Sequence, residues 1–151
     1  MCRLIRIFVF CACIGALAAC DTGPKSARGF RLPDGNAAKG QEIFVELECI
    51  SCHRVNGLEL PAPGAPGPVT VILGGETQAI KTYGELVSSI INPSHKLIRG
   101  YPEETVSQDG KSLMLVYNDR MTVQQLIDLV AFLQSKYEVV IPEYTYYGYR
   151  Y

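Results

Sequence analysis

Cysteine and histidine come together at one place in the sequence, Cys49-Ile50-Ser51-Cys52-His53. Two thiols separated by two residues can form a disulfide, bind a metal ion or bond covalently to an organic group. An imidazole directly after the second thiol adds a nitrogen that can coordinate a metal. The other four cysteines lie within the first 20 residues, so the six cannot form a disulfide framework spanning the chain. Chemistry in this protein is therefore expected at residues 49–53.

The spacing Cys-x-x-Cys-His is typical of covalent haem attachment. In that chemistry the thiols of Cys49 and Cys52 add to the two vinyl groups of one haem, and His53 binds the iron as an axial ligand. Two other interpretations stay open. A redox dithiol or simple disulfide leaves His53 without a role, and a zinc site needs a further ligand pair although His95 is the only other histidine.

The elements that must position this motif are predicted to be short helices. Each begins at a capping residue that is followed by apolar residues at helical spacing. The N-caps and approximate ranges are Asn36 for residues 37–48, Thr82 for residues 83–91 and Thr122 for residues 123–136. Residues 61–68 contain four prolines and must form a loop, and residues 100–111 are polar and irregular. Loops this long indicate that something other than side chains fills the core.

The sequence resembles class I cytochrome c domains over about Asp34 to Gln134, some two-thirds of the chain. Besides the cysteine motif, Gly40 and Phe44 match the first helix of that family, and residues 126–133, with Phe132 at the aromatic position, match its last helix. The resemblance implies an all-α, cytochrome c-like fold of short helices and long loops around one covalent haem c, in a domain at residues 34–136. It also implies that the first and last helices cross closely, with glycine permitting the approach.

A sixth ligand on the far side of the iron is expected from Met114. In the family this methionine lies in a loop shortly before the last helix, and Tyr117 fits the residue pattern that follows it, although Leu115 stands where proline is common. Met121, His95 and an open position are the alternatives. Methionine raises the reduction potential, whereas a second histidine would lower it. The resemblance also implies that the carbonyl of Pro68, with Pro66 as a second candidate, accepts a hydrogen bond from Nδ1 of His53.

The N-terminus is predicted to be a bacterial lipoprotein signal peptide at residues 1–19. Two arginines precede an uncharged stretch that reaches only about 20 Å as a helix, short of the roughly 30 Å bilayer core. The ending Leu17-Ala18-Ala19-Cys20 resembles a lipobox, which implies cleavage before Cys20 and a lipid on its thiol; an ordinary cleavage site is the alternative. Residues 20–33 are expected to form a flexible tether. The protein should then face the periplasm, with Asp21 slightly favouring the inner membrane.

The C-terminal residues 137–151 form a tyrosine-rich extension beyond the family resemblance. Three alternatives stay open for this extension: it packs across its own domain, it docks a partner, or it is disordered. The balance of 14 basic against 15 acidic residues argues against a nucleic-acid binder. The sequence therefore predicts a membrane-anchored electron carrier rather than an enzyme, acting between a redox donor and an acceptor. The alternative is a haem-bearing subunit of a larger periplasmic oxidoreductase.

Overall fold

The computed structural model describes residues 30–78 and 82–140. A boundary between Arg31 and Leu32 divides the chain into two units, and the fold described below belongs to the second. The predicted signal peptide, the lipidation site Cys20, the tether as far as Gly29 and the tyrosine-rich end from Ile141 lie outside the described residues.

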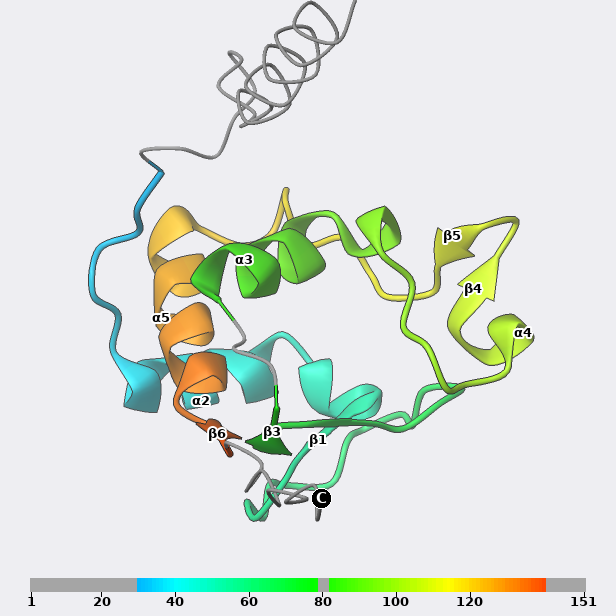
Figure 1. The fold of residues 1–151 in the computed structure, drawn as a ribbon, viewed down its shortest axis with the longest axis horizontal. Coiled ribbons are helices and arrows are strands. Elements are labelled where there is room, and N and C mark those ends of the chain that lie inside the picture. Colours follow the sequence, from blue (N-terminus) through cyan, green and yellow to red (C-terminus); the bar gives the residue numbers. More distant parts are fainter. Residues whose placement is uncertain (1–29, 79–81, 141–151) are drawn as a thin grey trace, which may run out of the picture. The chain divides into compact units, whose positions relative to one another are not determined.

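Short helices and long loops make up most of the described chain (Figure 1). The helices are α2 (Ala37–Glu46), η1 (Cys49–Ser51), α3 (Tyr83–Ile91), η2 (Pro93–His95), α4 (Glu103–Val106) and α5 (Val123–Gln134). None of the helices in the described ranges has the length and apolar character needed to cross a membrane.

The predicted N-caps of the three main helices are confirmed. The side chain of Asn36 accepts hydrogen bonds from the backbone N–H groups of Ala38 and Lys39, at 3.0 and 3.1 Å. Thr82 and Thr122 each form a complete capping box, with Glu85 and Gln125 respectively. These side chains satisfy N–H groups that a helix leaves unpaired at its start, so the local sequence determines where each helix begins.

The C-terminal ends of the helices depend more on the surrounding chain. Helix α3 ends at Ile91, before Asn92 and Pro93, as predicted. Helix α2 ends at Glu46, two residues earlier than predicted, because Glu48 adopts a left-handed conformation with φ of 55°. This turn redirects the chain into η1 and the cysteine motif.

Helices α2 and α5 cross at Gly40. A Cβ at this position would lie 2.6 Å from both the carbonyl carbon of Asp128 and the Cβ of Phe132, so only glycine permits the approach. One turn further on, the rings of Phe44 and Phe132 pack with centroids 5.6 Å apart, and each side chain is 1% exposed. The predicted close crossing of the first and last helices is therefore confirmed.

Within residues 30–78 and 82–140, short strands in the loops pair to form three two-stranded sheets. They are the parallel pair β1 (His53–Val55) and β2 (Val71–Leu73), the parallel pair β3 (Gly75–Thr77) and β6 (Tyr137–Val139), and the antiparallel pair β4 (Ser107–Gln108) and β5 (Lys111–Ser112). Residues 100–111 were predicted to be irregular, but α4 and the β4–β5 hairpin lie at residues 103–112. The hairpin turns at Asp109 and Gly110, both with positive φ. Because β6 pairs with β3, the first residues of the predicted C-terminal extension belong to the folded domain.

The hydrophobic core lies where α2, α3 and α5 meet. It also includes residues from the segment between α2 and β2. The buried members are Ile43, Phe44, Ile50, Val55, Leu86, Val87, Ile90, Leu129, Val130, Phe132 and Leu133. Ile50 lies within the cysteine motif and Val55 two residues after it, so burial of these two side chains attaches the motif to the helical core.

Candidate haem-attachment site

The two cysteines of the motif lie at the ends of one tight turn. Helix η1 begins at Cys49, and the N–H of Cys52 donates to the carbonyl of Cys49 at 3.2 Å. Residues three apart on a 3-10 turn lie one above the other, so this turn brings both side chains to one face. Both thiols are free and half-buried. Burial raises the pKa of the Cys49 thiol to about 11, so this thiol is protonated at neutral pH.

His53 follows directly as the first residue of β1, where it is paired in register with Val71. Its Nδ1 atom is buried and has no hydrogen-bond partner in the structure. Burial lowers the pKa of His53. The backbone of Val71 raises this pKa, but by less, so the neutral imidazole is favoured. The ring lies 6.4 Å from that of Phe44, which places His53 beside the crossing of α2 and α5.

Arg54 braces the turn that carries these residues. Its Nη1 donates to the carbonyl of Ile50, between the two cysteines, and to the carbonyl of His53 at 3.0 Å. Charge-assisted hydrogen bonds of this kind are stronger than neutral ones. The brace therefore limits the freedom of the motif before any group is attached to it.

The proline-rich loop lies against Cys52. The N–H of Gly67 donates to the carbonyl of Ser51 at 2.9 Å, and the N–H of Val71 donates to the carbonyl of Cys52 at 2.8 Å. A Cβ at Gly67 would overlap the Sγ atom of Cys52, so the absence of a side chain there makes room for the sulfur. Pro68 is exposed in the same loop. Because Nδ1 of His53 has no partner in the structure, its bond to the Pro68 carbonyl stays a prediction.

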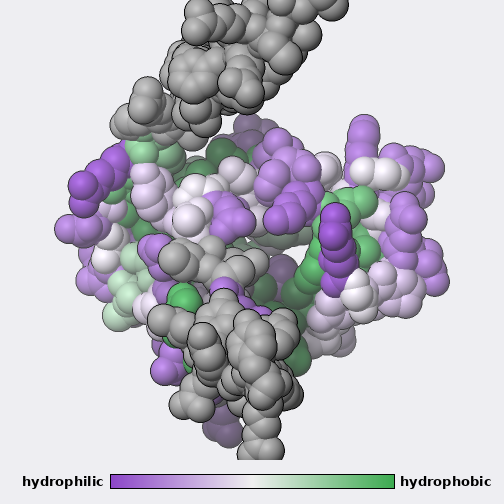
Figure 2. All heavy atoms as spheres, viewed as in Figure 1, coloured by the Kyte–Doolittle hydropathy of each residue, from purple (hydrophilic) through white to green (hydrophobic). Residues whose placement is uncertain are grey.

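Tyr117 connects the cysteines to the segment before α5. Burial raises the pKa of its phenol, and the charges of Cys49, Glu48 and Cys52 raise it further, against an opposite effect of Arg120. Tyr117 therefore lies within electrostatic range of the cysteine motif. Figure 2 shows an opening between the helical body and the lobe of α4, β4 and β5, with hydrophobic residues along its walls.

The three candidates for the sixth ligand have different surroundings. Met121 is half-buried and packs against the hydrophobic core. His95 is exposed, and its Nδ1 lies 2.7 Å from the carbonyl of Asn92. Met114 is half-buried, and its N–H donates to Oγ of Ser112 at 3.1 Å. Of the two methionines, Met121 packs against the hydrophobic core and Met114 is not among the described residues that do so.

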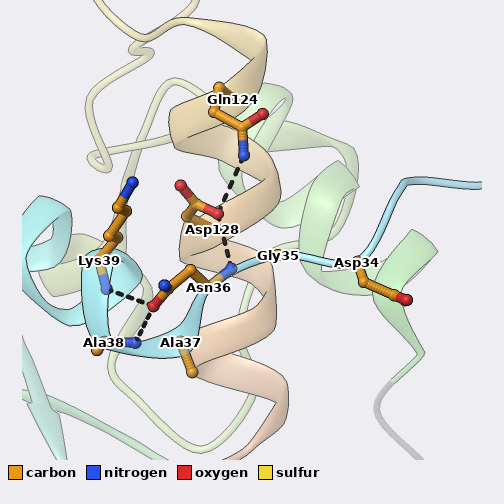
Figure 3. A pocket seen from close by; sticks show the side chains of 8 residues that line it. All are labelled: Asp34, Gly35, Asn36, Ala37, Ala38, Lys39, Gln124 and Asp128. Atoms are coloured by element: carbon orange, nitrogen blue, oxygen red, sulfur yellow. Dashed lines mark hydrogen bonds between the residues drawn. The ribbon is translucent and has the colours of Figure 1, made fainter.

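A separate pocket of about 640 Å³ lies at the start of α2, lined by residues 34–39, Gln124 and Asp128 (Figure 3). One oxygen of the buried Asp128 accepts from the N–H of Asn36 at 2.7 Å and from Nε2 of Gln124 at 3.1 Å. These bonds fasten the N-terminus of α2 to α5. The pocket shares no residue with the cysteine motif, and its buried carboxylate is used for this structural purpose. Within the described ranges no three His, Cys, Asp or Glu residues are grouped to hold a metal ion.

The geometry suits one large, flat, mostly apolar group. Two free thiols on one turn can hold it covalently, and glycine leaves space beside the second sulfur. The half-buried imidazole of His53 offers a nitrogen donor, and its buried Nδ1 has no hydrogen-bond partner. The residues present therefore fit a haem, and the arrangement defines a haem protein with a small helical fold.

The comparison with family models gives the same result. The model described as Cytochrome c matches residues 37–136, and the chain belongs to the cytochrome c family. It is a class I c-type cytochrome with one covalent haem c, and haem-based electron transfer between redox partners is its role. The predicted fold class, a cytochrome c-like fold of short helices and long loops, is confirmed. Neither the curated proteins nor the solved structures gave a match.

Several residues around the motif were not identified from the sequence. Ser94 and Asn118 hold the Met114 segment through hydrogen bonds to partners far away in the chain, and Ser112 bonds locally to the N–H of Met114. No local pattern marks a serine or asparagine for such a role. Gly67 could have been found, because a glycine before Pro68 offers no side chain beside whatever that loop contacts.

Proposed function

We propose that this protein is a one-electron carrier held at the periplasmic face of a bacterial membrane, with His53 and Met114 as the axial ligands of a haem bound through Cys49 and Cys52. The half-buried imidazole of His53, whose buried Nδ1 has no hydrogen-bond partner, stands beside two free thiols, and this is the observation on which the proposal rests. When bound, the haem supplies an iron that alternates between Fe(III) and Fe(II).

The residues of the chain hold and tune this group. The cysteine sulfurs fix it permanently, which suits a compartment in which a lost cofactor is not recovered. His53 must be unprotonated to donate its nitrogen lone pair, and the lowered pKa favours that form. Met114 contributes a neutral, soft sulfur that favours the reduced state. Burial of the site among apolar side chains also disfavours the more highly charged oxidised state, and so raises the potential.

The Met114 assignment is tested by Met114→Ala. Loss of the thioether should abolish the weak far-red absorption band of methionine-ligated ferric haem. It should also lower the reduction potential by on the order of 0.1 V, part of the roughly 0.8 V range that axial ligands span. The measurement is an absorbance spectrum with a redox titration of the purified protein.

The matched control is Met121→Leu, which keeps an apolar side chain of similar volume where Met121 packs against the core. This variant should retain the band and the potential. The reverse pattern, with the band kept in Met114→Ala and lost in Met121→Leu, would assign the ligand to Met121.

The membrane anchor is supported by the sequence Leu17-Ala18-Ala19-Cys20 and by the Gly-, Pro- and Ser-containing stretch that follows it. Extended at about 3.3–3.6 Å per residue, the tether at residues 20–33 could separate the haem domain from the bilayer by some 45 Å. Anchoring would raise the effective concentration of the carrier near membrane-bound donors and acceptors. Asp21 favours the inner membrane.

Replacement of Cys20 by serine tests the anchor, because serine cannot form the thioether with the lipid. The variant should lose lipid labelling and fail to appear as the mature lipoprotein, whereas Cys13→Ser, inside the predicted signal peptide, should behave as the parent. The readouts are incorporation of a labelled fatty acid and the mass of the N-terminal peptide. Equal labelling of the parent and Cys20→Ser would refute lipidation at this residue.

A further inference from the structure

The segment that carries Met114 is attached at its beginning to η2. The N–H of Ser112 donates to Oγ of Ser94 at 3.1 Å, and Oγ of Ser112 accepts from the N–H of Met114 at 3.1 Å. Two serine hydroxyls therefore form a continuous connection from η2 to the backbone of Met114.

The same segment is attached at its end to α3. Nδ2 of Asn118 donates to the carbonyl of Ile91 at 3.0 Å. Ile91 is the last residue of α3, where carbonyl groups have no partner within the helix. Both attachments therefore reach one corner of the fold, the turn Ile91–His95 between α3 and η2.

This corner is itself firmly held. Ile90 and Pro93 are buried, the N–H of Asn92 donates to the carbonyl of Ser88, and the N–H of His95 donates to the carbonyl of Asn92. By contrast, the side chains of Leu115 and Val116 between the two attachments are 63% and 58% exposed. Burial of these two side chains therefore contributes little to the position of the segment. The hydrogen bonds from the corner hold it at both ends, together with the bond from the N–H of Leu113 to the carbonyl of Val106 at 2.9 Å.

We propose that Ser94, Ser112 and Asn118 form a corner clamp that keeps Met114 on the iron and so excludes external nitrogen ligands. The three are positioning residues, since they act through the backbone on either side of Met114. The inference rests on the proposed function, in which Met114 is the sixth ligand.

Binding of added imidazole measures the strength of the clamp. Imidazole can reach the ferric iron only when Met114 is displaced, so its apparent affinity is the intrinsic affinity multiplied by the fraction of molecules in which the methionine is off. A clamp hydrogen bond that forms only while Met114 is on the iron stabilises the ligated state. Its removal should raise the fraction of molecules in which Met114 is displaced about fivefold.

The experiment is an imidazole titration of the purified ferric holoprotein, followed by absorbance. Ser94→Ala and Asn118→Asp should each bind imidazole about fivefold more tightly than the parent, and the double variant about 25-fold more tightly. Asn118→Asp keeps the shape of the side chain but removes the donor to Ile91. Ser94→Thr keeps the hydroxyl and should restore the parental affinity.

Ser89→Ala is the matched control. Its exposed hydroxyl donates to the carbonyl of Glu85 at 2.8 Å, a bond within α3, so the affinity for imidazole should not change. As a second readout, the amide hydrogen of Met114 should exchange faster in Ser112→Ala than in the parent, while exchange in α5 stays the same.

The outcomes separate this inference from the ligand assignment. If Met114→Ala keeps the far-red band, the ligand assignment fails. If that variant loses the band while Ser94→Ala and Asn118→Asp bind imidazole no more tightly than Ser89→Ala, the ligand assignment stands and the clamp is refuted.

Discussion

Replacement of Gly40 by alanine is expected to destabilise the haem domain severely. In a helix interior this change normally stabilises by about 0.5–1 kcal/mol, because alanine loses less backbone entropy than glycine. Here the new methyl group would overlap the carbonyl of Asp128 and lie 2.6 Å from the Cβ of Phe132. Real Cβ atoms essentially never come within 3.0 Å of such neighbours, so α2 and α5 would have to move apart.

Separation of the helices would disrupt the Phe44–Phe132 contact and the buried bonds of Asp128 at the start of α2. We expect a cost of more than about 3 kcal/mol, a large part of the roughly 5–15 kcal/mol that stabilises a domain. The measurement is the yield of haem-loaded protein together with the denaturant midpoint.

Gly84→Ala provides the control for this prediction. Gly84 lies in the first turn of α3, and a Cβ there would meet only Oγ1 of Thr82, at 3.9 Å. This variant should be at least as stable as the parent. Equal stability of Gly40→Ala and Gly84→Ala would show that the crossing at Gly40 is looser than described.

Replacement of Gly67 by alanine is expected to prevent formation of the thioether at Cys52 while leaving the fold intact. The added methyl group would overlap Sγ of Cys52, but its next neighbours, the carbonyl oxygen of Ser51 and the Cβ of Cys52, would be 3.2 and 3.5 Å away. Sγ is the free end of a side chain and can rotate away, whereas the backbone oxygen at Gly40 cannot. The strain is therefore relieved by turning the thiol out of position.

The test is alkylation of the unfolded holoprotein with iodoacetamide, followed by mass spectrometry of the haem peptide. In Gly67→Ala, Cys52 should be alkylated in most molecules while Cys49 stays linked to haem. Gly64→Ala, in the same loop with no neighbour within 4 Å of the added Cβ, should show both cysteines linked. Two intact thioethers in Gly67→Ala would contradict the predicted role of Gly67.

Some features of this protein follow from short stretches of sequence. Asn36, Thr82 and Thr122 cap their helices through bonds to backbone groups two or three residues away, so the partner is present wherever the residue is. The spacing of Cys49, Cys52 and His53 likewise depends on a single turn. These local relations predicted the helix starts correctly and identified the candidate site.

Other features were decided only by the tertiary structure. The β3–β6 pairing and the hydrogen bonds from Ser94 and Asn118 join segments that are distant in the chain. Backbone and hydroxyl groups occur throughout any sequence, so their partners depend on how the chain closes around its core. The end of α2 at Glu46 has the same origin, because the chain turns at Glu48 to bring Ile50 into the core and His53 beside Phe44. The chemistry of the site was therefore encoded locally, whereas the supports that hold Met114 and Cys52 in place depend on long-range packing.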